Sequence, residues 1–322
     1  MKKILILHTG GTIAMQEDPT TGVIQTKLNN PLLEATLVLP NHVEIQTEDS
    51  FNLPSPHITP FHMLTLKNRI QKAITEGFES IVITHGTDTL EETAFFLDTT
   101  IGNQIPIIIT GAMRSSNELG SDGLYNFLSA IRVAATPEAV GMGVLVVMND
   151  EIHSARYVTK THTSNVATFL TPTLGPVGLI NKNRILFLQK IIEIPHLDVT
   201  TVEGLIPIVK AYAGMHGEIL EVLTQTKIDG LVIEAFGAGN LPPDTMAPLQ
   251  HMIQQGIPVV LVSRCFNGLA EPVYSYPGGG KELSDLGMIF CTNLSSQKAR
   301  LKLLIAQNNP LTASERIQFM ES

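Results

Sequence analysis

Residues 80–114, "SIVITHGTDTLEETAFFLDTTIGNQIPIIITGAMR", contain a strand, a helix and a second strand in succession. The apolar runs at 80–84 and 105–110 lack apolar–polar alternation, which is typical of parallel strands buried on both faces of a sheet. The segment "LEETAFFL" between them has the composition of a helix. This order of elements predicts an α/β fold.

The same alternation extends over most of the chain. Thr59 followed by Pro60 predicts the start of a helix between the first two strands, and Ser295 or Ser296 the start of another near the C-terminus. Further strands are expected at 4–7, 144–148, 230–236, 257–263 and 288–291.

The chain of 322 residues is long enough for two domains. Residues 189–207, "QKIIEIPHLDVTTVEGLIP", contain two prolines and no helical period, so we expect a linker there. The predicted domains are therefore an N-terminal α/β domain at 1–188 and a C-terminal α/β domain at 208–322.

The composition narrows the class of function. The net charge of −9, without clustered Lys and Arg, argues against nucleic-acid binding and favours a small polar substrate. No apolar run approaches the ~20 residues of a membrane span, and the run at 4–7 is shorter than the ~7–15 residues of a signal-peptide core. We therefore expect a cytoplasmic protein whose two cysteines, Cys265 and Cys291, are reduced.

Reactive side chains follow the predicted strands directly. "HTGGT" comes after the first strand and "HGTDT" after the second, which places Thr12, Thr87 and Asp88 at the carboxyl edge of the sheet. Ligands of open parallel α/β sheets bind at this edge. A threonine nucleophile needs a base, and Lys160, past the fourth strand, is a candidate if its surroundings favour the neutral amine.

The glycines and histidines allow other interpretations. Gly10 and Gly11 also fit a plain tight turn, and "TGGT" does not match a phosphate loop. "PGGGKEL" at 277–283 favours a flexible surface loop. His57 and His62 lack metal-site spacing, so we expect no metal ion and no cofactor.

Some of the polar residues near these motifs favour a structural role. His8 and His85 each end an apolar run and are expected to be buried structural side chains. Asp88 or Thr89 is expected to cap the helix "LEETAFFL", with Glu91 or Glu92 completing a capping box, and this structural role is favoured for Thr89.

Several motifs together resemble one family, the bacterial-type L-asparaginases, which are threonine amidohydrolases. "TGGTIA" at 9–14 and "THGTDTLEETAFFL" at 84–97 resemble its two signature segments. The resemblance implies a larger, flavodoxin- or Rossmann-like N-terminal domain with a mixed, mainly parallel sheet, and a smaller C-terminal α/β domain with a parallel sheet. Further matches are "TGAMR" at 110–114, "SDGLYN" at 121–126, "VVMNDEIHSARYVTKTHT" at 146–163 and "NLSSQKARLKLL" at 293–304.

The resemblance also implies a reaction. Thr12 would attack the side-chain amide of L-asparagine, release ammonia and leave a β-aspartyl ester that water hydrolyses to aspartate. Thr87, Asp88 and Lys160 match a second triad, in which the lysine and threonine move protons and the aspartate binds the α-ammonium group.

Substrate-binding residues are implied in the same way. Ser55 matches the serine that holds the α-carboxylate, with Gly11 and Gly86 beside the substrate. The backbone N–H of Ala112 and the region near Thr87 would stabilise the tetrahedral intermediate.

The family usually forms homodimers or homotetramers with active sites near an intimate dimer interface. Asn240 resembles a substrate-side residue donated by the neighbouring subunit, and Glu282 is the nearest match to a partner-subunit glutamate. The family's loop tyrosine is missing from "QEDPTTGVIQTK", where Val23 stands near its place. Deprotonation of Thr12 is then left to water or to Thr87 and Lys160.

The sequence leaves one alternative for the substrate range and one for the activity itself. Pro56 stands where relatives with glutaminase activity often carry glutamine, which favours asparagine over mixed asparagine and glutamine specificity. A non-catalytic amino-acid sensor on the same fold is the alternative from a different class.

Overall fold

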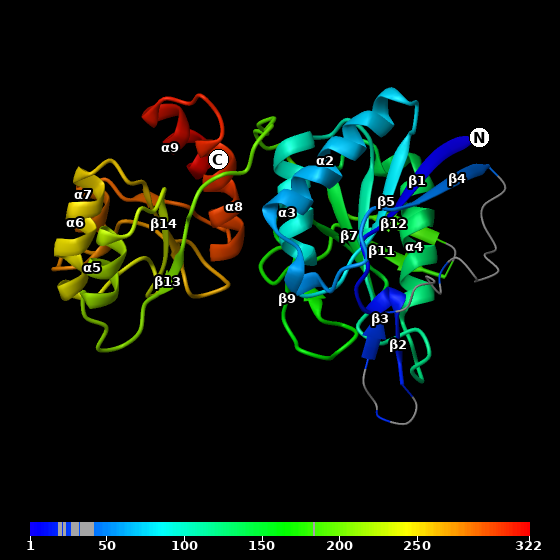
Figure 1. Ribbon diagram of the computed structural model, residues 1–322, viewed down its shortest axis with the longest axis horizontal. Coiled ribbons are helices and arrows are strands. Elements are labelled where there is room, and N and C mark those ends of the chain that lie inside the picture. Colours follow the sequence, from blue (N-terminus) through cyan, green and yellow to red (C-terminus); the bar gives the residue numbers. More distant parts are fainter. Residues whose placement is uncertain (19–20, 22–23, 27–31, 33–41, 183) are drawn as a thin grey trace. The chain divides into compact units, whose positions relative to one another are not determined.

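The computed structural model describes residues 1–18, 21, 24–26, 32, 42–182 and 184–322 (Figure 1). The chain divides into two compact units, Met1–His196 and Leu197–Ser322. Each unit is an α/β assembly with its own sheet, as the sequence predicted.

The first unit is built on an eight-stranded sheet in the order β12-β11-β8-β7-β6-β5-β1-β4. The five strands from β7 to β4 run parallel, and β8, β11 and β12 add antiparallel neighbours, so the sheet is mixed and mainly parallel. The strands are β1 (Lys2–His8), β4 (Val43–Asp49), β5 (Ser80–Thr84), β6 (Ile107–Thr110), β7 (Val144–Met148), β8 (Glu151–Ser154), β11 (Gly178–Asn181) and β12 (Arg184–Phe187). Two small hairpins accompany it, β2 (Met15–Glu17) with β3 (Ile24–Thr26), and β9 (Thr159–Lys160) with β10 (Phe169–Leu170).

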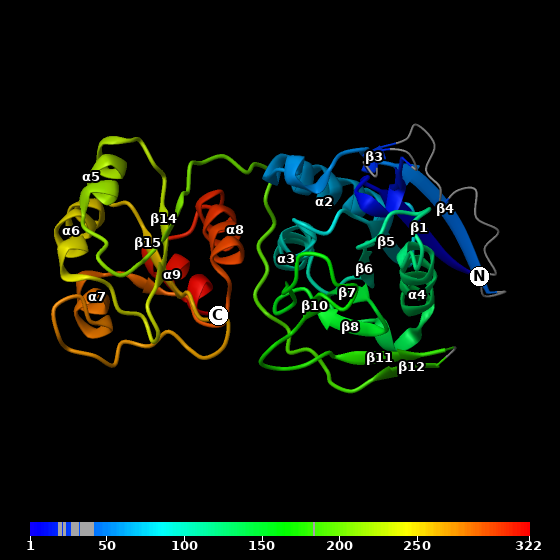
Figure 2. The ribbon, with the colours of Figure 1, turned by 90° about the horizontal axis from the view of Figure 1, so that it is seen from below.

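Helices cover both faces of this sheet. Figure 2 shows α2 (Pro60–Thr75) and α3 (Leu90–Ile101) on one face and α4 (Gly123–Ala135) on the other. Coverage on both faces explains why every residue of β5, β6 and β7 is buried and why most of them are apolar, Ser80, Thr84 and Thr110 being the exceptions. The predicted start of α2 is confirmed, since Thr59 forms a capping box in which its backbone N–H donates to His62 Nδ1 at 3.1 Å.

The register of the parallel strands places their carboxyl ends level. His8 at the end of β1 pairs with Thr84 at the end of β5, and Thr84 pairs with Thr110 at the end of β6. The three loops that follow these strands therefore start side by side at one edge of the sheet.

The second unit contains a four-stranded parallel sheet in the order β13-β14-β15-β16. Its strands are β13 (Ile208–Lys210), β14 (Leu231–Ala235), β15 (Val259–Ser263) and β16 (Ile289–Phe290). Its helices are α5 (Glu218–Gln225), α6 (Met246–Gln254), α7 (Gly280–Leu286), α8 (Ser296–Gln307) and α9 (Ala313–Glu321).

One expectation about this unit is wrong. The segment "PGGGKEL" is not a flexible surface loop, because Gly278, Gly279 and Gly280 are buried and the last of them begins α7. A Cβ atom on Gly278 would lie 2.2 Å from the Leu241 carbonyl oxygen. The glycines therefore allow the backbone to pack against a neighbouring segment.

The described residues contain neither a membrane span nor a metal cluster. Within these ranges, none of the helices combines the length and the hydropathy of a membrane span. Nor does any group of three or more His, Cys, Asp or Glu side chains there form a potential metal site.

Candidate functional site

Two glycines in contact bring the loops after β1 and β5 together. A Cβ atom on Gly11 would lie 2.2 Å from Gly86 Cα, and the φ angle of Gly11 is 82°. Both the space and the backbone conformation therefore require glycine at position 11. Thr12 follows the first of these glycines and Thr87 the second, so the contact brings the two threonine-bearing segments next to each other.

Lys160 joins this edge from the β9–β10 hairpin. Its ammonium group donates to Thr87 Oγ1 at 3.0 Å and to Asp88 Oδ1 at 2.7 Å. The lysine side chain is 17% exposed and that of Asp88 57% exposed, whereas Thr87 is buried. The lysine therefore connects a buried hydroxyl to a carboxylate that faces solvent. The structure thus brings Thr87, Asp88 and Lys160 together across more than 70 residues of sequence.

Ser55 lies against the same loop. It begins a short 3-10 helix (Ser55–His57), and its hydroxyl oxygen accepts a hydrogen bond from the Asp88 backbone N–H at 3.1 Å. A Cβ atom on Gly86 would lie 2.7 Å from Ser55 Cβ. Ser55 therefore belongs to the cluster around Gly86 and Asp88.

The expected capping box at Thr89 is wrong. Thr89 occupies the N-cap position of α3, but its hydroxyl donates to the Ser55 carbonyl oxygen at 2.8 Å and does not cap the helix. Ser55 lies close enough to capture this hydroxyl, so Thr89 links two site loops.

Thr12 and Ala112 flank the cluster. Thr12 begins a 3-10 helix (Thr12–Ala14) and is half-buried, whereas Ala112 is fully buried in the loop after β6. Among the residues with described positions, no acceptor is found for the backbone N–H groups of Thr12, Thr87 and Ala112. Buried N–H groups are nearly always paired, so this edge has donors available for an oxygen atom of a ligand.

Asn240 and Glu282 lie in the second unit. Asn240 Oδ1 accepts from the Gly280 N–H at 3.1 Å, and Glu282 Oε2 accepts from the Gly278 N–H at 2.8 Å. Both side chains therefore hold the glycine segment that begins α7. Val23, the position near the missing loop tyrosine, lies outside the described residues.

His85 is a buried structural neighbour of Thr87. Its Nδ1 lies 2.7 Å from the Gly86 carbonyl oxygen, and its Nε2 lies 2.9 Å from Thr93 Oγ1. A carbonyl oxygen only accepts, so Nδ1 carries the proton and Nε2 accepts from Thr93. Burial lowers the pKa of His85 to about 4, which keeps the ring neutral.

The free energy of unfolding is expected to fall as the pH drops from about 6.5 to about 4. A depressed histidine pKa means that the unfolded chain binds more protons in this window, so stability is present above 6.5 and lost toward 4. His85 alone contributes up to about 3 kcal/mol of this loss. Burial lowers the pKa of His153 to about 4 as well, and it acts in the same direction.

Urea unfolding at several pH values checks this expectation. His85→Gln and His153→Gln should each flatten the dependence of stability on pH, whereas His57→Gln, at an exposed position, should leave it unchanged. If the dependence of stability on pH is unaltered in both His85→Gln and His153→Gln, the attribution of this dependence to the two buried histidines is wrong.

The sequence patterns did not identify Asp122, whose carboxylate lies beside the site, as a functional residue. Asp122 accepts hydrogen bonds from the backbone N–H groups of Met113 at 3.1 Å and Arg114 at 3.0 Å, in the loop that contains Ala112. The available signal was an acidic residue directly before a helix, inside the motif "SDGLYN".

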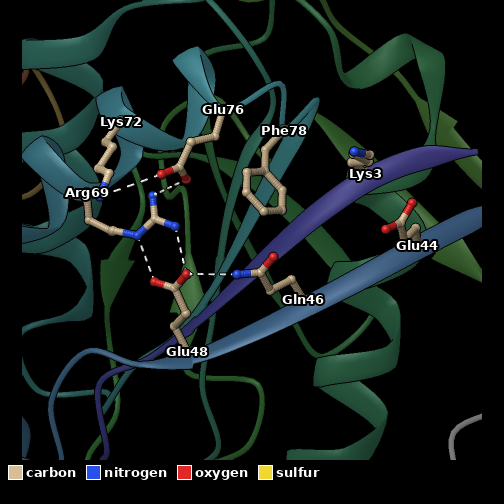
Figure 3. Close-up of a pocket in the computed structure, with 8 residues that line it drawn as sticks. All are labelled: Lys3, Glu44, Gln46, Glu48, Arg69, Lys72, Glu76 and Phe78. Carbon is tan, nitrogen blue, oxygen red and sulfur yellow. Dashed lines mark hydrogen bonds and ion pairs between the residues drawn. The ribbon is translucent and has the colours of Figure 1, made fainter.

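A cavity of about 420 Å³ lies elsewhere on the first unit, beside β1, β4 and the end of α2 (Figure 3). Lys3 and Glu44 line it near the amino ends of their strands, away from the carboxyl edge. The Arg69 guanidinium within it is already paired with Glu48 at 2.7 Å and Glu76 at 3.0 Å. The lining contains three cationic residues, Lys3, Arg69 and Lys72, and three anionic ones, Glu44, Glu48 and Glu76, so the cavity offers no net formal charge to a ligand.

Both units are similar to domains of known proteins. The asparaginase N-terminal domain matches residues 3–193, and the glutaminase/asparaginase C-terminal domain matches residues 206–320. The chain is 35% identical over 308 residues to the L-asparaginase of Bacillus licheniformis, covering 94% of this chain and 95% of the relative. It is 29% identical over 336 residues to a component of the glutamyl-tRNA(Gln) amidotransferase of Methanosphaera stadtmanae, covering 100% of this chain and 75% of that protein.

A solved structure agrees with these matches. The structure of a probable cytoplasmic L-asparaginase from Campylobacter jejuni superposes with a TM-score of 0.88 at 30% identity, covering 99% of each chain. The loops that carry Thr12, Thr87 and Lys160 all lie within the matched N-terminal domain, which supports amide hydrolysis as the general chemistry. The chain belongs to the asparaginase family.

Proposed function

We propose that this protein hydrolyses the side-chain amide of L-asparagine to L-aspartate and ammonia, with Thr12 as the nucleophile. The observation that carries the proposal is the position of Lys160, whose ammonium group contacts both the Thr87 hydroxyl and the Asp88 carboxylate. A hydroxyl, an amine and a carboxylate in one network provide the proton transfers that amide hydrolysis needs.

In the first half of the reaction, Thr12 Oγ1 forms a bond to the amide carbon and the carbonyl oxygen becomes negatively charged. The N–H of Ala112, for which the described residues supply no acceptor, stabilises this charge. The C–N bond then breaks, and the threonine proton passes to the leaving nitrogen through water or through Thr87 and Lys160. Ammonia leaves, and a β-aspartyl ester remains on Thr12.

In the second half, water adds to the ester carbon and the bond to Thr12 breaks. The water gives up one proton, which returns to Thr12 Oγ1, and L-aspartate is released. Thr87 accepts a hydrogen bond from Lys160, so its own hydroxyl proton points away from the lysine and is available to the reacting group.

Ser55 and Asp88 bind the α-substituents of the substrate. Ser55 Oγ accepts from the Asp88 N–H, which leaves its hydroxyl proton for the α-carboxylate. The exposed Asp88 carboxylate holds Lys160 through one oxygen and offers the other to the α-ammonium group. Gly11 and Gly86, without side chains, let the substrate approach the backbone.

The assembly is proposed to be a homodimer or homotetramer in the cytoplasm. Asn240 and Glu282 would then reach the active site of a neighbouring protomer near the intimate dimer interface. Water, or Thr87 together with Lys160 in its neutral amine form, deprotonates Thr12 in place of the missing loop tyrosine.

Ammonia release from L-asparagine, L-glutamine and D-asparagine tests the substrate. We expect kcat/KM for L-asparagine to exceed that for L-glutamine by about 10- to 200-fold, the usual discrimination for one methylene group. Pro56→Gln should narrow this ratio. No ammonia from any of the three amides, with binding of L-asparagine retained, would instead identify an amino-acid sensor.

A further inference from the structure

A carboxylate fixes one side of the loop that carries Ala112. Asp122 occupies the N-cap position of α4, but its side chain does not cap that helix. It accepts instead from the Met113 N–H at 3.1 Å to each oxygen and from the Arg114 N–H at 3.0 Å. The carboxylate is thus committed to the backbone that follows Ala112.

A buried amide fixes the other side. Asn126, 1% exposed, donates through Nδ2 to the Gly111 carbonyl oxygen at 3.1 Å and to Asp122 Oδ2 at 3.0 Å. Its Oδ1 accepts from the N–H of Asn149, a residue with a φ angle of 50° in the turn between β7 and β8. The Asn126 side chain therefore connects the loop after β6, the turn between β7 and β8, and the Asp122 carboxylate.

These contacts determine where the Ala112 N–H points. The Gly111 carbonyl and the Ala112 N–H belong to the same planar trans peptide, so they point in opposite directions. Asn126 holds the carbonyl on its own side, and the N–H must therefore point away from Asn126.

Packing supports this direction. A Cβ atom on Gly111 would lie 3.3 Å from Thr87 Cγ2, and one on Gly123 would lie 3.3 Å from Ala112 Cβ and 3.2 Å from Ile13 Cγ1. The loop of Thr87 thus lies beside Gly111, and the Ala112 side chain lies near Ile13, the residue that follows Thr12.

We propose that Asp122 and Asn126 are positioning residues that hold the Ala112 N–H toward the oxygen atom that becomes negatively charged during the reaction. The proposal rests on the proposed function. Donors fixed in advance stabilise such a charge without having to reorganise, whereas a peptide free to rotate would not.

Asn126→Ala is expected to lower kcat for L-asparagine by about 10- to 100-fold, because a misplaced donor loses much of its effect. KM and the affinity for L-aspartate should stay within about threefold of wild type, since the α-substituents are held elsewhere. Hydrogen exchange at residues 111–114 should become faster. Thr100→Ala, which removes a buried hydrogen bond of 2.7 Å to the Phe96 carbonyl oxygen in α3, is the matched control and should change none of these.

If Asn126→Ala does not fold, Asp122→Asn gives the same test, since it keeps one oxygen for Met113 and Arg114 but turns an NH₂ group toward Asn126. A kcat equal to that of Thr100→Ala, a loss confined to KM, or unchanged exchange at 111–114 would overturn the proposal. If the wild-type protein releases no ammonia, the proposed function fails, and the exchange measurement still decides whether the network fixes this loop.

Discussion

Lys160→Met is expected to lower kcat for L-asparagine by about 100- to 10,000-fold, the usual contribution of a positioned proton-transfer group. Methionine keeps most of the length of the side chain but removes the ammonium contacts to Thr87 at 3.0 Å and to Asp88 at 2.7 Å. Because the lysine side chain is only 17% exposed, bulk solvent replaces it poorly. Substrate binding should change far less, since Ser55 and the second Asp88 oxygen remain.

Lys210→Met is the matched control. Lys210 forms an ion pair of 2.9 Å with Glu234, but in the second unit and with 65% of its side chain exposed. Exposed pairs contribute little to stability, so this variant should retain the wild-type kcat. An effect of Lys160→Met confined to KM would remove Lys160 from proton transfer.

The central strands could be predicted because burial on both faces leaves an uninterrupted apolar run. The runs at 80–84 and 144–148 are β5 and β7 to the residue. The run at 105–110 begins two residues early, because Pro106 has no N–H to donate and β6 starts at Ile107. In each case, sheet burial alone was a sufficient signal.

The edge strands could not be predicted from such runs. β4 reads "VEIQTED" and pairs on one side only, so its polar residues face solvent. The other edge strand, β12, and its inner neighbour β11 likewise alternate between more and less buried residues. Exposed residues interrupt the apolar run in these strands, so they resemble loops in sequence.

The site was only partly accessible from sequence. Strand order alone placed Thr12 and Thr87 on one edge, and the level strand ends agree with that placement. The contact of Lys160 with Thr87 depends on the β9–β10 hairpin, which has no clear sequence pattern. The donation from Thr89 to Ser55 depends on a loop 34 residues away, which no local capping rule can foresee.

Thr12→Ala is expected to have the largest effect of all, on the order of a 10,000-fold loss of kcat or more, because it removes the atom that forms the ester. The fold should survive, since Thr12 is half-buried and its hydroxyl makes no hydrogen bond among the residues that the structure describes. Thr12→Ser, which keeps a hydroxyl, should retain measurable turnover.

The most direct test of the account is the rate of ammonia release from L-asparagine by wild-type protein and by folded Thr12→Ala at equal concentration. The account predicts rapid release by the wild type and almost none by the variant. Unchanged release by Thr12→Ala would contradict it.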